Sequence, residues 1–197
     1  MGLVIGFYST VPRSGKNTAA DVVAKYLQAP VQEFSHPGKD MLTGMVMRLG
    51  YTEEEAKNFF YTQPETVIPE LGVTGRYLQQ TLMTDWGRNQ VHKDLWVMLT
   101  IPSSKPKGLN TVISGVRFPN EYEYIKAQGG KVYKITNSKA LEAFKRAHGG
   151  GLENHPSEGL LEEHEFDGVL SNESTKEAFE ELVFRNVVLP NFPQNHS

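Results

Sequence analysis

The sequence has no cysteine, no long apolar run and no excess of basic residues over its 197 positions. Without cysteine, the chain forms neither disulfide bonds nor thiolate metal sites. The formal net charge of −3 argues against a broad electrostatic contact with DNA or RNA, although clustered arginines would still hold one small anion. No apolar stretch approaches the length of a membrane span, and the first residues, MGLVIGFY, lack the features of a signal peptide. We therefore expect a cytoplasmic protein whose partners include neither nucleic acids nor membranes.

The sequence does contain a strand, a glycine-containing turn and a helix near its start. Residues 3–8, LVIGFY, form a short apolar run that predicts a buried strand. Residues 17–28 carry apolar side chains at helical spacing, and Pro30 follows as a stop. Residues 31–35 predict a second strand. This order is a βαβ unit, in which the turn lies between the carboxyl end of a strand and the amino end of a helix.

Strands and helices alternate along the rest of the chain. Further strands are predicted at 110–116, 131–136 and 166–172, and residues 62–74, with two prolines and a glycine, predict a loop. Helices are predicted at 37–49, at 53–61, at 75–100 with a break near Gly87, from Pro119 to the Gly129-Gly130 pair, and at 174–186. The alternation predicts an α/β fold with a parallel sheet covered by helices on both faces.

The turn itself, SGKNT at 14–18, is close to a phosphate-binding P-loop. It departs from the pattern G-x-x-x-x-G-K-[ST] at Thr10, where glycine is expected, and at Asn17, where serine or threonine is expected. In such a loop, backbone N–H groups and a helix amino terminus surround phosphate oxygens. Gly15 would permit the close backbone approach, and Lys16 would reach the outer phosphates.

Three neighbouring side chains add to this hypothesis. Arg13 is a second cation with bidentate geometry, and the Asn17 carbonyl or the Thr18 hydroxyl would ligate Mg²⁺ directly or through water. The alternative is an ordinary strand–turn–helix connection with the lysine in solvent. The βαβ context favours the phosphate site.

Further polar residues lie outside the loop. Arg76, Gln80 and Thr84 fall on one helical face by their four-residue spacing, with Trp86 as a stacking surface for a base. The alternative is a solvated face with the tryptophan in the core. Arg117 comes just after a strand, where parallel-sheet proteins bind ligands; its alternative is an ion pair with Glu121 or Glu123. For Lys39, after the second strand, the alternative is a surface lysine.

Six segments together resemble the bacteriophage-type deoxynucleoside monophosphate kinases, over nearly the whole chain. They are RSGKNTAAD, FSHPGKD, LQQTLMTDWGR, VRFPNEYEYIKAQGGKVYKI, HPSE and VLSNESTKEAFEEL. That family commonly carries an acidic residue after the loop lysine, where Asn17 stands. It usually has an aspartate two residues before the arginine that matches Arg117, and Gly115 stands there. Asp40 or Asp85 would be candidates to compensate.

The resemblance implies a P-loop NTPase fold of the nucleoside monophosphate kinase type, a five-stranded parallel sheet flanked by helices with a mobile lid. It implies one domain over 1–188, with an acceptor-binding region at about 37–100, a lid at about 137–160 and a flexible tail at 189–197. It also implies a homodimer and, if the protein is viral, a location in the host cytoplasm.

The implied reaction is ATP + dNMP → dNDP + ADP with Mg²⁺. The implied catalytic residues are Lys16, Arg88 and Arg117. The ATP-binding residues are Arg13, Ser14, Gly15, Lys16, Asn17, Thr18 and Asn172. The acceptor would be bound by Lys39, Arg76, Gln80, Trp86, Arg88 and Arg117, and Arg146 would belong to the lid. Two alternatives remain: a kinase for another phosphorylated small molecule, or a nucleotide-binding module without turnover.

Overall fold

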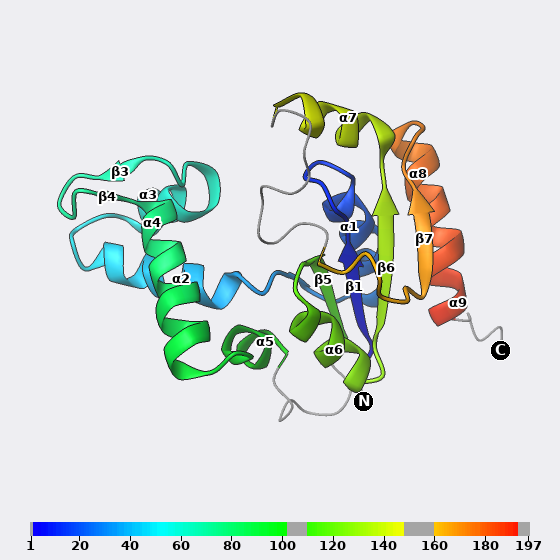
Figure 1. The fold of residues 1–197 in the computed structure, drawn as a ribbon, viewed down its shortest axis with the longest axis horizontal. Coiled ribbons are helices and arrows are strands. Elements are labelled where there is room, and N and C mark those ends of the chain that lie inside the picture. The colour runs from blue at the N-terminus through cyan, green and yellow to red at the C-terminus, as the bar shows by residue number, and fades with distance from the viewer. Residues whose placement is uncertain (1, 102–109, 148–159, 193–197) are drawn as a thin grey trace. The chain divides into compact units, whose positions relative to one another are not determined.

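The computed structural model describes residues 2–101, 110–147 and 160–192 (Figure 1). The chain divides into two compact units, the first made of residues 1–33 and 104–197 and the second of residues 34–103. Among the described residues, no helix is long and apolar enough to cross a membrane.

The first unit is built on a five-stranded sheet with the order β2-β5-β1-β6-β7. All four neighbouring pairs are parallel, so the strands point in one direction (Figure 1). The strands are β1 (Val4–Tyr8), β2 (Val31–Gln32), β5 (Thr111–Val116), β6 (Lys131–Thr136) and β7 (Gly168–Ser171). Parallel strands need helical crossovers, which explains the alternation of strands and helices in the sequence.

Helices cover both faces of this sheet. On one face, Ile5 and Phe7 of the fully buried strand β1 join a core with three elements: α1 (Lys16–Leu27), α8 (Lys176–Val183) and the π-helix η3 (Phe184–Val188). On the other face, a side chain at Gly6 would meet Val116 at 2.7 Å and Ile125 of α6 (Pro119–Ala127) at 2.9 Å. The predicted α/β class with a parallel sheet flanked by helices is therefore confirmed.

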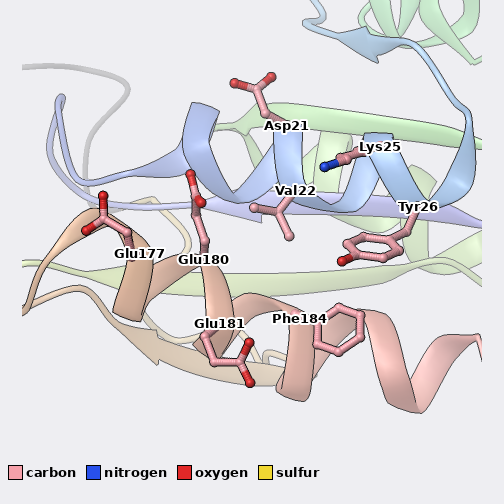
Figure 2. A pocket seen from close by; sticks show the side chains of 8 residues that line it. All are labelled: Asp21, Val22, Lys25, Tyr26, Glu177, Glu180, Glu181 and Phe184. Carbon is pink, nitrogen blue, oxygen red and sulfur yellow. The ribbon is translucent and has the colours of Figure 1, made fainter.

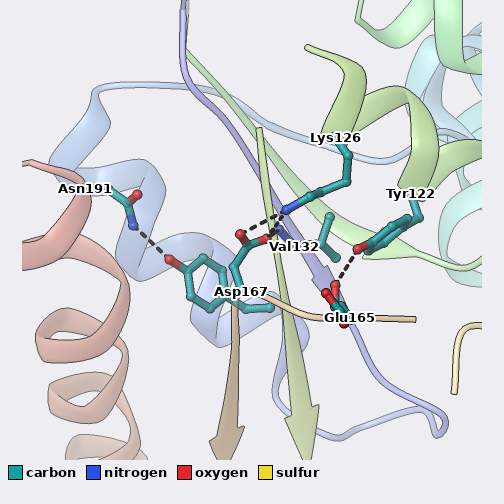
Figure 3. Close-up of polar contacts among 7 residues, drawn as sticks. Tyr122, Lys126, Val132, Glu165, Asp167 and Asn191 are labelled. Atoms are coloured by element: carbon teal, nitrogen blue, oxygen red, sulfur yellow. Dashed lines mark hydrogen bonds and ion pairs between the residues drawn. The ribbon is translucent and has the colours of Figure 1, made fainter. Parts of the chain in front are cut away.

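A polar cluster fastens the amino-terminal edge of β6 to its neighbours (Figure 3). The carboxylate of Asp167 accepts a hydrogen bond from the backbone of Val132 at 2.7 Å and pairs with Lys126 of α6 at 2.9 Å. The hydroxyl of Tyr133 accepts a hydrogen bond from Asn191 of the short helix α9 (Leu189–Asn191) at 2.9 Å. Burial raises the pKa of the Tyr133 phenol. These contacts are structural, because they lie at the edge opposite to the β1–α1 turn.

Two regions named from the sequence are described only in part. Helix α7 (Ser138–Ala147) occupies the start of the expected lid, and residues 148–159 of that lid lie outside the described residues. In the expected tail, α9 is helical, and residues 193–197 lie outside the description. The boundaries of domain, lid and tail remain predictions.

The second unit is mostly helical. Its core contains Leu42, Val46, Ala56, Phe60 and Ile68. Its helices are α2 (His36–Met47), α3 (Glu53–Lys57), α4 (Gly75–Gln80) and α5 (Leu95–Thr100), with π-helices η1 (Asn58–Thr62) and η2 (Thr81–Val91). Its strands are β3 (Val67–Ile68) and β4 (Val73–Thr74).

Two local predictions in this unit were wrong. The stretch 62–74 is not only loop, because β3 and β4 pair antiparallel within it, with Gly72 at a φ of 66° in their connection. The helical break falls between η2 and α5, not at Gly87. A Cβ at Gly87 would lie 2.5 Å from the ring of Trp96 on α5, so this glycine allows η2 and α5 to pack closely.

Candidate phosphate-binding site

The loop between β1 and α1 turns the chain with two residues in the left-handed region. Arg13 has a φ of 58° and Gly15 a φ of 109°. Gly15 is the cap residue of the 12-residue helix α1; no side chain caps the first amides, and the first turn contains no acidic residue. The positive end of the helix dipole is therefore not neutralised locally, which is the arrangement that binds anions at helix amino termini.

Gly15 is required for two separate reasons. Its φ is costly for any residue with a side chain, and an added Cβ would lie 2.5 Å from Asn172 Nδ2 and 3.0 Å from Phe179. The same amide nitrogen of Asn172 donates to the Ser14 carbonyl at 2.8 Å. No local sequence pattern indicates this contact, because 158 residues separate the two partners.

Lys16, the first residue of α1, folds back over the loop. Its Nζ donates to the Val11 carbonyl at 3.1 Å, and the residue is half-buried. This differs from the alternative reading, in which the lysine extends into solvent. Because an ammonium carries three N–H donors, the bond to Val11 does not exclude a phosphate oxygen as a further acceptor.

The other loop residues differ in exposure. Arg13 and Asn17 are exposed, and Thr18 is half-buried. Ser14 is only 1% exposed, and its hydroxyl has no partner within the described ranges.

The oxygen donors of Asn17 and Thr18 fit a magnesium ion. Mg²⁺ in kinases takes one or two protein oxygens and completes its shell with phosphates and water. Both donors lie in the first turn of α1, next to Lys16. The described residues contain no cluster of three or more histidine and carboxylate groups that would form an all-protein cage. The set therefore suits an ion that binds together with a nucleotide.

Arg117 follows β5 at the same carboxyl edge of the sheet. The carboxylate of Glu121, which is 2% exposed, accepts the backbone N–H groups of Arg117 at 2.8 Å and Phe118 at 3.2 Å. The Glu121 carboxylate is directed at the main chain, and no ion pair of Arg117 with a described carboxylate is present. The positive charge of the exposed Arg117 guanidinium at this edge of the sheet is therefore not neutralised by a neighbouring carboxylate of the described residues. The sequence did not predict that Glu121 fixes the backbone of Arg117 and Phe118, the two residues that follow β5.

Gly115 lies in a bulge at the end of β5. Gly6 pairs with Ile113 and Tyr8 with Val116, so one residue of β1 faces two residues of β5. A Cβ at Gly115 would have no atom within 4 Å. Packing therefore does not explain why aspartate is absent from this position.

In the second unit, two of the expected acceptor residues contact neighbours within that unit. Arg76 Nε pairs with Glu65 at 3.0 Å, and Lys39 Nζ lies 4.8 Å from the centre of the Tyr61 ring. The hydroxyl of Tyr61 donates to Asp40 at 2.7 Å.

The two tryptophans of this unit have opposite environments. Trp86 is 41% exposed, so the reading that places it in the core is wrong. Trp96 is the buried tryptophan, 1% exposed, and its indole donates to the Met83 carbonyl at 2.8 Å.

The three residues of the predicted polar face, Arg76, Gln80 and Thr84, are all exposed. Arg76 and Gln80 lie on α4, where four-residue spacing keeps side chains on one face. Thr84 and the half-buried Arg88 lie on η2, a π-helix that follows α4 directly.

Arg146 lies near the end of α7. It pairs with Glu142 one turn earlier at 3.1 Å and is strongly exposed. Its assignment to a lid remains a prediction.

A groove of about 380 Å³ runs between α1 and α8, away from the loop residues named above (Figure 2). Its lining includes the carboxylates of Asp21, Glu177, Glu180 and Glu181, and Lys25 is the cation in it. An excess of carboxylates repels a triphosphate, so the groove is not a nucleotide phosphate site.

No protein-family model matches the chain. The chain is 31% identical over 116 residues to the uncharacterized protein ORF77 of Ictalurid herpesvirus 1 (strain Auburn), a match that covers 59% of this chain and 44% of that protein. The match thus spans less than half of that relative.

Among solved structures, dephospho-CoA kinase from Campylobacter jejuni has 13% identity and a TM-score of 0.47, covering 95% of this chain and 96% of that one. An unliganded sugar kinase from Janibacter sp. HTCC2649 has 14% identity and a TM-score of 0.39, covering 94% of each chain. These weak similarities give no information about the substrate of this chain.

The sheet order and the loop after β1 define the class. The chain has an α/β fold with five parallel strands flanked by helices, and a glycine-containing turn leads from β1 into the amino end of α1.

Proposed function

We propose that the protein is a deoxynucleoside monophosphate kinase, which transfers the γ-phosphoryl group of ATP to a dNMP and yields dNDP and ADP. The observation that carries the proposal is the left-handed Gly15 immediately before Lys16 and the uncapped, acid-free first turn of α1. The six sequence segments that resemble this kinase family support the choice of dNMP as acceptor.

On the donor side, the loop amides and Lys16 hold the β- and γ-phosphates of ATP. Phosphoryl transfer demands positioning and charge neutralisation more than covalent chemistry, so a fixed set of donors is the main requirement. Asn17 and Thr18 would hold Mg²⁺ directly or through water, and a bound ion would supply charge neutralisation at the phosphates.

On the acceptor side, Arg117 and Arg88, with Arg13, bind the monophosphate and stabilise the charge that develops during transfer. Lys39, Arg76, Gln80 and Trp86 shape the site for the nucleoside. No strong base is needed, because the attacking phosphate is already an anion. Arg146 acts with the lid to exclude water, which would otherwise compete as acceptor.

The test is a coupled assay of ADP release with Mg-ATP and each dNMP in turn, with the diphosphate product identified by chromatography. Turnover with at least one dNMP, lost in Lys16→Ala, is the expected result. ATP binding without a diphosphate product from any dNMP would contradict the proposal.

The second candidate is a P-loop kinase for another phosphorylated small molecule. Gly115 supports this second candidate. The dNMP kinases that the chain resembles usually have an aspartate at this position, and it is absent here although the space around a Cβ is open. A panel of phosphorylated acceptors in a thermal-shift assay separates the two, since only the true acceptor raises the melting temperature together with an ATP analogue.

A further inference from the structure

The described contact between Asn172 and the phosphate loop joins two distant parts of the sheet edge. Asn172 comes directly after β7, and its Nδ2 donates to the Ser14 carbonyl at 2.8 Å. Ser14 is only 1% exposed, so this carbonyl lies where water is scarce and the bond is not easily replaced.

Asn172 is itself held from two directions. Its backbone N–H donates to the Thr136 carbonyl at the end of β6, at 2.8 Å. The next residue, Glu173, accepts bonds from the backbone N–H of Ser138 at 2.7 Å and its hydroxyl at 2.5 Å, at the start of α7. The side chain that contacts the loop therefore extends from a fixed point rather than from a free turn.

This contact sets the direction of a backbone N–H in the loop. In a planar trans peptide, the carbonyl of one residue and the N–H of the next point in opposite directions. Because Asn172 holds the Ser14 carbonyl toward the end of β7, the N–H of Gly15 points to the opposite side of that peptide. The same amide also lies against Gly15, 2.5 Å from where a Cβ would be, which restricts other conformations.

We infer that Asn172 is a positioning residue, which orients the Ser14–Gly15 peptide so that its N–H meets a nucleotide phosphate, and that it acts through the loop rather than by contact with the adenine. This inference rests on the proposed phosphate binding at the loop. Asn172 thus affects every ligand with the same polyphosphate chain, whatever base it carries.

The experiment compares ATP with inorganic tripolyphosphate, which has the phosphates but no base. Binding of both is measured by calorimetry to the full chain and to Asn172→Ala. A second variant, Asn172→Leu, keeps the branched shape but has no polar group, so it lacks the hydrogen-bond donor. Loss of one hydrogen bond predicts about 3- to 10-fold weaker binding of both ligands, by the same factor.

Asn186→Ala is the matched control, because Asn186 Nδ2 donates to a backbone carbonyl, that of Leu182, at the same 2.8 Å but on η3. It is expected to bind both ligands as the unaltered chain does. Circular dichroism and melting temperature show whether each variant is folded.

The outcomes separate the inference from the proposed function. If both Asn172 variants weaken ATP but not tripolyphosphate, the side chain contacts the base and the inference is overturned. Unchanged binding of both ligands overturns it as well, while leaving the proposed function intact. If the unaltered chain binds neither ligand, the phosphate site and the inference built on it both fail.

Discussion

The phosphate loop and the second unit hold their candidate residues in different ways. In the loop, Gly15 and Ser14 are fixed by Asn172, and Arg13 has no described carboxylate partner; the same holds for Arg117, which follows β5 at the same edge of the sheet. In the second unit, Arg76 is paired with Glu65 and Lys39 lies over Tyr61.

The difference concerns the cost of binding a phosphate. A loop already held in its bound conformation loses little entropy when the ligand arrives, and unpaired cations have no protein partner to release. A paired arginine must first exchange a carboxylate for the substrate. We therefore expect the loop and Arg117 to be pre-organised, and the acceptor residues of the second unit to gain their contacts as the substrate binds.

Lys16→Ala tests the loop most severely. We expect kcat to fall by about 100- to 1,000-fold, because this is the usual cost of removing one pre-organised hydrogen-bond donor that stabilises charge in the transition state. The control is Lys25→Ala, which removes an exposed lysine from the same helix. Comparable losses in both variants would show that charge alone, rather than position in the loop, is responsible.

Gly15→Ala is expected to have the second largest effect. The left-handed φ costs a residue with a side chain about 1–2 kcal/mol, and the contact with Asn172 adds to this. Chemical denaturation should show a loss of stability beyond the strain alone, and ATP affinity should fall.

Gly129→Ala isolates the strain, because Gly129 has a φ of 71° and open space around its Cβ position. It should lose stability by about 1–2 kcal/mol and keep its ATP affinity. Equal stability losses in the two variants would argue that the Asn172 contact is unimportant.

The sequence predicted the sheet and the loop because both depend on local signals. Short apolar runs mark β1, β5 and β6, and Gly15-Lys16 lies at the start of a periodic helix. The contacts that fix the loop could not be predicted, since Asn172 meets Ser14 only after the sheet has formed. The two Trp residues show the same limit, because their chemistry is identical and only tertiary packing decides that Trp96 is buried and Trp86 exposed.

The second unit deviated most from the sequence pattern. The helix predicted over 75–100 is divided into α4, the π-helix η2 and α5, and apolar periodicity alone does not distinguish a π-helix from an α-helix. Residues 67–68 and 73–74 are too short for strand periodicity to reveal.

Glu65→Gln probes the ion pair of the second unit. Releasing Arg76 should lower the KM for the dNMP by a few-fold, and Arg76→Ala should raise it, with the KM for ATP unchanged in both. Because the pair is exposed, its loss should alter stability by about 0–1 kcal/mol. Steady-state kinetics in both substrates measures this, with Glu181→Gln as control, since Glu181 pairs with Arg185 on the first unit. A change in the KM for ATP alone would contradict the assignment.

The substitution Gly115→Asp tests whether a carboxylate near the end of β5 strengthens metal binding. The open space around the Cβ predicts a folded variant, and we expect a few-fold lower Mg²⁺ concentration for half-maximal activity. A magnesium titration at saturating ATP measures it. An unaltered magnesium dependence in an active variant would show that position 115 does not reach the metal.

The smallest expected effect is a difference in acid sensitivity between two exposed carboxylates, one in each unit. Hydrogen bonds from Ser138 hold the pKa of Glu173 below its ordinary 4.5, and bonds from Thr52 do the same for Glu55. Each therefore adds stability that is present above pH 4.5 and is lost as the pH falls through the lowered pKa. The partners of Glu173 are 35 residues away, whereas Glu55 closes a capping box with a residue three positions before it.

The bonds of Glu173 disappear when the sheet unfolds, but those of Glu55 can re-form in an isolated helical turn. Acidification should thus loosen the start of α7 more than it destabilises α3. NMR titration of the two carboxylates, with hydrogen exchange of the amides of α7 and α3, measures the difference. Ser138→Ala should move the pKa of Glu173 back toward 4.5 and leave that of Glu55 unchanged. If the carboxylate of Glu173 titrates at its ordinary value in the unaltered chain, its bonds to Ser138 do not persist in solution, and the anchor of Asn172 is weaker than its contacts indicate.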